Sequence, residues 1–79
     1  MFTIEHEFDA TVITLIDEGD QPLEEDVTIT AFEDRVTVEQ VDPETDEVLR
    51  ITLSAAMLRD LAAAMDLPEG SYRLVARRP

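Results

Sequence analysis

The sequence contains no cysteine, no lysine and no tryptophan, and it has only two glycines in 79 residues. Without cysteine the chain can form neither a disulfide nor a thiolate metal site, so redox chemistry gives no indication of its compartment. No apolar run approaches the roughly 20 residues that a membrane-spanning helix requires. Residues 1–5 lack the basic start and apolar run of a signal peptide. We therefore expect a cytoplasmic protein that does not dock on membranes.

Positive charge is also scarce. Six arginines stand against 19 acidic residues, which gives a formal net charge of −13. Residues 1–40 carry 12 acids and one arginine, a net charge of −11, whereas residues 41–79 carry 7 acids and 5 arginines, a net charge of −2. A surface this negative repels phosphate backbones and anionic membranes. We therefore expect no direct binding to nucleic acid, and we expect the partners to be proteins.

The length of the chain predicts a single acidic domain over residues 1–79. Its apolar share of 44% is sufficient for a globular fold and argues against disorder. A domain this small buries only about 60% of its unfolded surface, so its core is marginal by itself. A partner surface often supplies the missing stability at this size.

Two segments with alternating apolar residues predict a hairpin over residues 27–32 and 35–41, with a tight turn at Glu33 and Asp34. This register makes one face of the hairpin apolar and the other polar. It predicts the pairs Ala31 with Val36, Ile29 with Val38, Val27 with Gln40, Phe32 with Arg35, Thr30 with Thr37, and Thr28 with Glu39. A slip of one residue would destroy this segregation, so the register is well specified. The turn lacks the glycine that two-residue turns prefer.

A second hairpin, turning through residues 43–46, satisfies the same test. Its predicted pairs are Val38 with Ile51, Val36 with Leu53, Glu39 with Arg50, and Thr37 with Thr52. The apolar pairs fall on the apolar face of the first hairpin, and opposite charges and threonines are favourable neighbours on the other face. The agreement of two hairpins on one face is the strongest structural indication in the sequence. The loops at residues 17–26 and 42–47 collect turn-forming and acidic residues.

The ends of the chain complete the predicted fold. Residues 2–8 and 11–16 read as two strands or as one long bent strand. Ser54 is a good N-cap for a helix over about residues 55–66, which Leu67 and Pro68 terminate. Residues 71–77 alternate again and predict a last strand. The expected fold is α+β, with the order βββββαβ: a mostly antiparallel sheet of five to six strands with one helix packed on one face.

Such a helix is too short to cover the whole sheet. It is about 10 Å wide, and strands lie about 4.8 Å apart, so it shields two or three strands. Residues 12–16 are apolar on both sides, which indicates that something covers their second side. A homodimer is the simplest cover. The candidate apolar interface is Val12 and Ile16.

No residue combination indicates catalysis. His6 lacks a nearby partner for acid–base work, and we interpret it as a histidine at the edge of the core. Ser54 and Ser71 lack the surroundings of a nucleophile and are explained by a helix cap and a turn exit. The run Asp42, Glu44, Asp46 has the alternating spacing of a calcium loop, but it lacks the glycine and the terminal glutamate. We expect neither a cofactor nor a metal.

Two further groups have structural interpretations. Met57 and Met65 lie at helical spacing and are expected on the core side of an amphipathic helix rather than in a groove for partner helices. The cluster Arg73, Arg77 and Arg78 is expected to pair with acidic side chains rather than with phosphate.

These observations predict a non-enzymatic protein-interaction module, expected to be a homodimer. The alternative is an acidic mimic of nucleic acid that inhibits a DNA- or RNA-binding protein, although adaptation to salt or simple solubility also explains the acidity. A small enzyme is a second, disfavoured alternative. The candidate acidic surface comprises Asp17, Glu18, Asp20, Glu24, Glu25, Asp26, Glu33 and Asp34.

Overall fold

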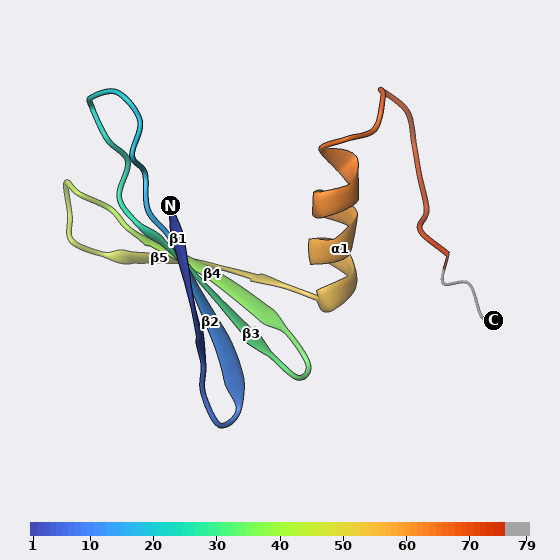
Figure 1. The fold of residues 1–79 in the computed structure, drawn as a ribbon, viewed down its shortest axis with the longest axis horizontal. Coiled ribbons are helices and arrows are strands. Elements are labelled where there is room, and N and C mark those ends of the chain that lie inside the picture. Colours follow the sequence, from blue (N-terminus) through green and yellow to red (C-terminus); the bar gives the residue numbers. More distant parts are fainter. Residues whose placement is uncertain (76–79) are drawn as a thin grey trace.

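The structure is a computed structural model that describes residues 1–75. Five strands form one antiparallel sheet, and one helix follows them (Figure 1). The elements are β1 (Phe2–His6), β2 (Ala10–Leu15), β3 (Val27–Phe32), β4 (Val36–Val41), β5 (Val48–Leu53) and α1 (Ala55–Ala64). The strand order is β1-β2-β3-β4-β5, so each strand pairs with its neighbour in sequence. This arrangement confirms the predicted small α+β fold.

The predicted register between β3 and β4 is confirmed at each of its paired strand positions. The turn between them forms without glycine. The Phe32 N–H donates to the Arg35 carbonyl at 2.8 Å, and the Arg35 guanidinium lies 4.4 Å from the centre of the Phe32 ring. Arg35 also contacts the Asp34 carboxylate at 3.0 Å. A cation–π contact and a charge pair thus stabilise this turn.

The predicted register between β4 and β5 is confirmed as well. Arg50 and Glu39 form an ion pair at 2.9 Å on the polar face, as cross-strand neighbours of opposite charge do. The loop closes with the Asp46 N–H donating to the Asp42 carbonyl at 2.8 Å. Asp46 has a φ of 60°, a left-handed conformation that aspartate tolerates better than most residues.

Residues 2–15 form two strands rather than one bent strand. β1 and β2 pair along their length. The Glu7 N–H donates to the Ala10 carbonyl at 2.8 Å, which closes the turn. Phe8, which the alternation placed in the first strand, lies in this turn and is fully exposed.

The helix begins as predicted and ends two residues earlier than predicted. Ser54 Oγ accepts a hydrogen bond from the Met57 N–H at 3.1 Å, which caps α1. The last strand predicted over residues 71–77 is not formed across residues 71–75, and residues 76 and 77 lie outside the described part of the chain. The chain instead turns back beside α1, where the Tyr72 hydroxyl donates to the Pro68 carbonyl at 2.9 Å. Residues 71–75 therefore do not pair with an edge strand of the sheet.

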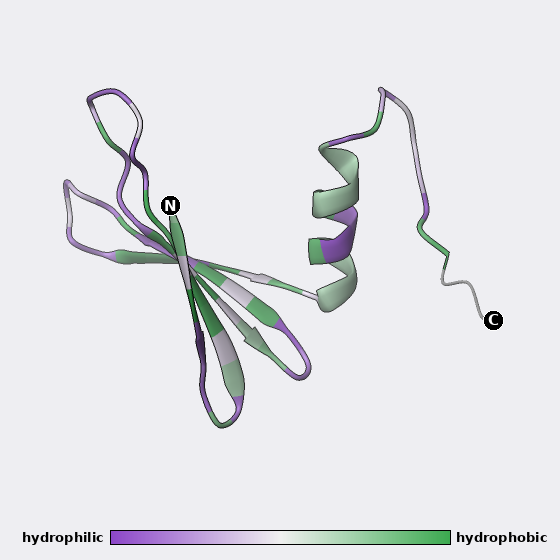
Figure 2. Cartoon of the chain, in the orientation of Figure 1, coloured by the Kyte–Doolittle hydropathy of each residue, from purple (hydrophilic) through white to green (hydrophobic). Residues whose placement is uncertain are grey.

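The described residues enclose very little core. Among residues 1–75, only Val36 and Thr37 are buried, and both lie in β4. The loops at both ends of the sheet are hydrophilic, whereas the strands and α1 carry apolar residues (Figure 2). α1 stands beside the sheet, which it approaches at β5, the strand that precedes it (Figure 1). The sheet is regular, but most of its apolar surface is uncovered.

Candidate interaction surface

One face of the sheet is almost entirely apolar, and we call it the apolar face. The register aligns three rows of side chains across all five strands. The apolar face comprises Phe2, Ile4, His6, Thr11, Ile13, Leu15, Val27, Ile29, Ala31, Val36, Val38, Gln40, Leu49, Ile51 and Leu53. None of these fifteen residues is an aspartate, a glutamate or an arginine.

The middle row of the apolar face crosses the sheet as Ile4, Ile13, Ile29, Val38 and Ile51. Ile4 and Ile51, at its two ends, are 53% and 62% exposed. A side chain of this kind contributes about 1.5–3 kcal/mol when it is fully buried. The row therefore offers substantial free energy to whatever covers it.

The opposite face of the sheet is rich in threonine, and we call it the threonine face. Val12, in β2, lies on this face and is paired with Glu5 in β1 and with Thr30 in β3. Ile16 follows β2 on the same alternation, and its N–H donates to the Met1 carbonyl at 2.9 Å. Val12 and Ile16, the candidate apolar interface, are both half-buried. The more exposed large apolar residues of the sheet lie mainly on the apolar face.

The sequence correctly predicted that one helix, about 10 Å wide, leaves part of a sheet with strands about 4.8 Å apart uncovered. The candidate interface that it indicated, Val12 and Ile16, lies on the threonine face. It missed Phe2, Ile4 and Ile51, which lie on the apolar face and are each more than half exposed. An edge residue of a wide sheet is left uncovered by a single helix.

Acidic residues gather at one end of the sheet. The β2–β3 loop and the β4–β5 loop lie side by side at that end (Figure 1). The carboxylates that this brings together are Asp17, Glu18, Asp20, Glu24, Glu25, Asp26, Asp42, Glu44, Asp46 and Glu47. Glu33 and Asp34, in the β3–β4 turn, lie at the other end. The candidate acidic surface is therefore divided between the two ends.

Asp17 organises the acidic loop through its own carboxylate. Its two oxygens accept hydrogen bonds from the Gly19 N–H at 2.9 Å and the Glu24 N–H at 3.0 Å. The hydrogen bond from Glu24, followed by that from Gly19, lowers the pKa of Asp17 below its ordinary value. Glu18 forms an ion pair with the Met1 amino group at 3.1 Å, which ties the loop to the start of the chain. The loop is therefore an ordered structure.

The remaining candidate residues have structural partners. His6 Nδ1 lies 3.2 Å from Thr11 Oγ1, its neighbour across the strands. In the β4–β5 loop the Asp42 carboxylate accepts from the Glu44 N–H at 2.9 Å, as in an ordinary turn. Within residues 1–75, no cluster of three or more His, Asp or Glu side chains is arranged to hold a metal ion. In the same range, no helix has both the length and the apolar composition needed to cross a membrane.

The arginine cluster is only partly described. Arg73 lies in the segment after α1 and is exposed, whereas Arg77 and Arg78 lie outside the described residues. No ion pair is recorded for Arg73 in the described part of the chain. The predicted pairing of this cluster with acidic side chains stays a prediction.

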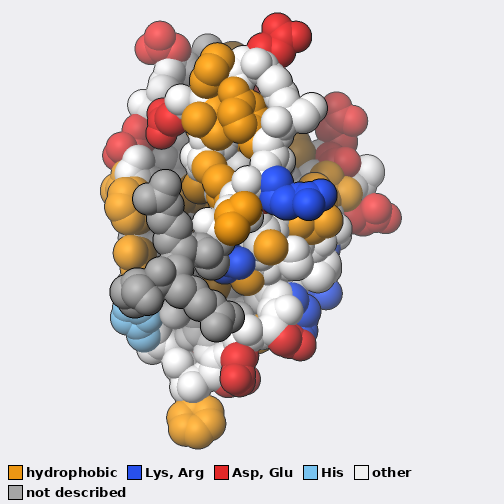
Figure 3. Space-filling model, turned by 90° about the vertical axis from the view of Figure 1, so that its right-hand side faces the viewer, with side chains coloured by type: hydrophobic (Ala, Val, Ile, Leu, Met, Phe, Trp, Pro, Cys, Tyr) orange, Lys and Arg blue, Asp and Glu red, His pale blue; other side chains and the backbone are white. Residues whose placement is uncertain are grey.

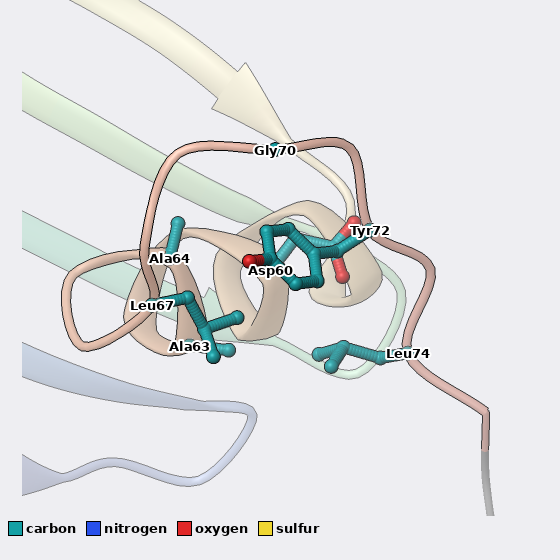
Figure 4. Close-up of a pocket in the computed structure, with 7 residues that line it drawn as sticks. All are labelled: Asp60, Ala63, Ala64, Leu67, Gly70, Tyr72 and Leu74. Atoms are coloured by element: carbon teal, nitrogen blue, oxygen red, sulfur yellow. The ribbon is translucent and has the colours of Figure 1, made fainter.

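A small cavity of about 230 Å³ lies between α1 and the segment that follows it (Figure 4). Its lining residues are Asp60, Ala63, Ala64, Leu67, Gly70, Tyr72 and Leu74. The Tyr72 hydroxyl is already bonded to the Pro68 carbonyl. The lining is mostly apolar, and Asp60 is its single acid, so we interpret the cavity as a seam between two packed segments.

The comparisons with known proteins bear on the sheet and the helix together. No curated protein and no solved structure matches the chain. A family model matches residues 3–64, a range that begins in β1 and ends at the last residue of α1. The matched unit thus includes the apolar face except Phe2, both acidic loops and the helix. On this match the chain belongs to the family described as a domain of unknown function, DUF8831.

Proposed function

We propose that this protein is a non-enzymatic interaction module, cytoplasmic as its sequence predicts, that forms a homodimer through the apolar face of its sheet. The observation that carries the proposal is the amount of uncovered surface. The chain exposes 7104 Å², whereas a compact protein of this mass exposes about 4,800 Å². The excess of about 2,300 Å² lies in the range that obligate homodimers bury per subunit.

The shape of the chain supports the same proposal. Its radius of gyration is 15.1 Å, compared with about 12 Å for a compact domain of this length. A sheet with one uncovered apolar face is not stable by itself in water, because that face must pack against another element. A second copy supplies such an element with the same apolar character.

Charge favours the apolar face over other surfaces as the interface. Two copies with a net charge of −13 each repel one another. The apolar face contains no carboxylate. On the side of the molecule shown in Figure 3, acidic side chains lie mainly around the rim, whereas hydrophobic side chains gather in the middle. Contact through this face buries no carboxylate and keeps the acidic loops in solvent, where salt screens them.

Two substitutions in β5 test the proposal. Ile51→Asp places a carboxylate on the apolar face, and Thr52→Asp places the same charge on the threonine face; both residues are exposed in the single chain. Light scattering after gel filtration measures the mass of each variant. We expect Ile51→Asp to be monomeric and Thr52→Asp to stay dimeric. Equal behaviour of the two variants would count against the apolar face as the interface.

The acidic-mimic alternative is supported by one observation, the gathering of both acidic loops at one end of the sheet (Figure 1). Carboxylates on a rigid frame can imitate the phosphates of a duplex. The test is a pull-down from host lysate at low and high salt, followed by competition with duplex DNA. A captured protein that binds only at low salt and that duplex DNA displaces supports the mimic.

Charge reversal provides the matched control for the mimic. Glu24→Lys with Glu25→Lys changes the acidic end, and Glu33→Lys with Asp34→Lys makes an equal change at the opposite end. The mimic requires loss of the captured protein from the first double variant only. Equal retention by both double variants would remove this alternative.

A further inference from the structure

The helix carries an apolar stripe that the sheet of its own chain leaves exposed. Met57, Leu61 and Met65 recur at intervals of four residues, which places them on one side of α1 and its C-terminal end. They are 57%, 56% and 80% exposed. Among the residues of α1 none is buried. The stripe and the apolar face are thus two apolar surfaces of one chain that do not cover each other.

A helix of this length requires a packing partner. α1 has 10 residues, whereas isolated helices shorter than about 12–15 residues are marginal in water. Within residues 1–75, α1 approaches β5 and packs against the segment that follows it, which lines the cavity together with Asp60, Ala63 and Ala64 of the helix (Figure 4). None of the three stripe residues lines that cavity, and their exposed surface is available to another chain.

The connection between β5 and α1 restricts where the helix can go. Ser54 is the only residue between the two elements, and it is extended, with φ −74° and ψ 160°. Its side chain is engaged in the cap, through the hydrogen bond from the Met57 N–H at 3.1 Å. Folding the stripe down onto its own sheet would require a change at this single residue. Short connections of this kind favour exchange of an element between two copies.

We propose that two copies exchange their helices, so that the stripe of each α1 packs on the apolar face of the other copy. This inference rests on the proposed function, because it specifies how the dimer is built. Exchange of the helices covers both the stripe and the apolar face. It also leaves Ser54 in the extended conformation that it has in the single chain. The stripe carries no charged residue, as the apolar face carries none, so the contact is apolar on both sides. The partner's helix then completes the core that each sheet lacks.

The absence of cysteine makes a disulfide test specific. In the double variant Ile13→Cys with Leu61→Cys, one cysteine lies on the apolar face and the other in the stripe. The molar mass of the reduced protein is first measured by light scattering, and the protein is then oxidised and run on a denaturing gel. Exchange predicts a native dimer that becomes a covalent dimer. The control is Thr14→Cys with Leu61→Cys, which puts the first cysteine on the threonine face and should give only background cross-linking.

The outcomes separate the two proposals. A native dimer whose disulfide forms within each chain, or that forms no disulfide, overturns the exchange and leaves the proposed homodimer intact. A native monomer overturns both. A second variant tests the exchange without introducing cysteines. It carries a flexible linker of about six glycine and serine residues between Leu53 and Ser54, which allows each helix to pack on the sheet of its own chain. Exchange predicts at least a tenfold weaker dimer for this variant, and an unchanged dimer contradicts it.

Discussion

The sheet and the helix of this protein are held in place by different means. Each strand of the sheet has backbone partners and cross-strand side-chain pairs, such as Arg50 with Glu39, supplied by its own chain. α1 has its own backbone hydrogen bonds, the Ser54 cap and the short segment after it. The sheet is therefore specified by local sequence, whereas in our proposal the place of the helix depends on contacts with a second copy. The predictions below test this difference.

The largest effect is expected at the stripe. Leu61→Asp removes an apolar contact from each copy of a symmetric dimer and places a carboxylate there. Loss of about 1.5–3 kcal/mol per copy corresponds to a dimer at least about 100-fold weaker. Sedimentation equilibrium measures the dissociation constant. Ala55→Asp adds the same charge to α1 outside the stripe and should leave the dimer unchanged; equal weakening by both variants would show that charge alone is responsible.

A smaller effect is expected at the helix cap. Ser54→Ala removes the oxygen that accepts from the Met57 N–H, which costs about 1 kcal/mol of helix stability. Because the helix supplies part of the interface and both copies lose the cap, about 2 kcal/mol in all, the dimer should weaken by about 30-fold. Circular dichroism at 222 nm followed over dilution measures helix loss and dissociation together. Ser71→Ala removes the other serine hydroxyl of the chain and should change neither helix content nor dimer affinity. Helix content that does not vary with dilution would contradict the proposed coupling between helix formation and dimerisation.

Within the sheet, the turn between β3 and β4 is the site of the next effect. Arg35→Ala removes the cation–π contact with Phe32, and an exposed contact of this kind contributes about 0.5–1 kcal/mol. Urea denaturation of Arg35→Ala, of Phe32→Leu and of the double variant gives the coupling energy between them. We expect the dimer to persist in all three, because the change lies within the locally specified sheet. Zero coupling would show that the ring and the guanidinium do not stabilise the turn.

The smallest effect is expected at Asp17. Because hydrogen bonds hold its folded pKa below the unfolded value, the carboxylate stabilises the fold above the unfolded pKa. That stabilisation is lost as the pH falls through the folded pKa. Asp17→Asn should therefore be less stable than the wild type near neutral pH, with the difference shrinking on the acid side of the ordinary aspartate range. Thermal melts across pH measure the difference, with Asp20→Asn as the control in the same loop.

The register of the sheet was predictable because a slip of one residue would reverse every side chain. Ala31 with Val36 and Val38 with Ile51 could be assigned from alternation alone, and the structure confirms both. The separation of Glu33 and Asp34 from the acidic loops was also within reach of the sequence. In a sheet of sequential strands, successive turns lie at alternate ends. The turn at Glu33 and Asp34 looked weak because it lacks glycine. In the structure, a contact between the Arg35 side chain and the Phe32 ring stabilises this turn instead.

The position of the helix was not predictable from the same patterns. The spacing of Met57, Leu61 and Met65 identifies an apolar side of a helix but not the surface that covers it. Nor does the alternation in residues 71–75 produce a strand, because strand formation depends on packing against neighbouring strands, which alternation alone does not specify. These positions depend on packing between distant segments, and in our account between two chains.

Sedimentation equilibrium of the unmodified protein, at low and at high salt, tests the central claim most directly. We predict a particle of twice the 8.9 kDa chain mass at both salt concentrations. Its dissociation constant should fall as salt rises, because screening reduces the repulsion between two acidic copies. A monomer at every protein concentration and both salt concentrations would contradict the account, because the apolar face and the helix stripe would then have no partner in a second copy.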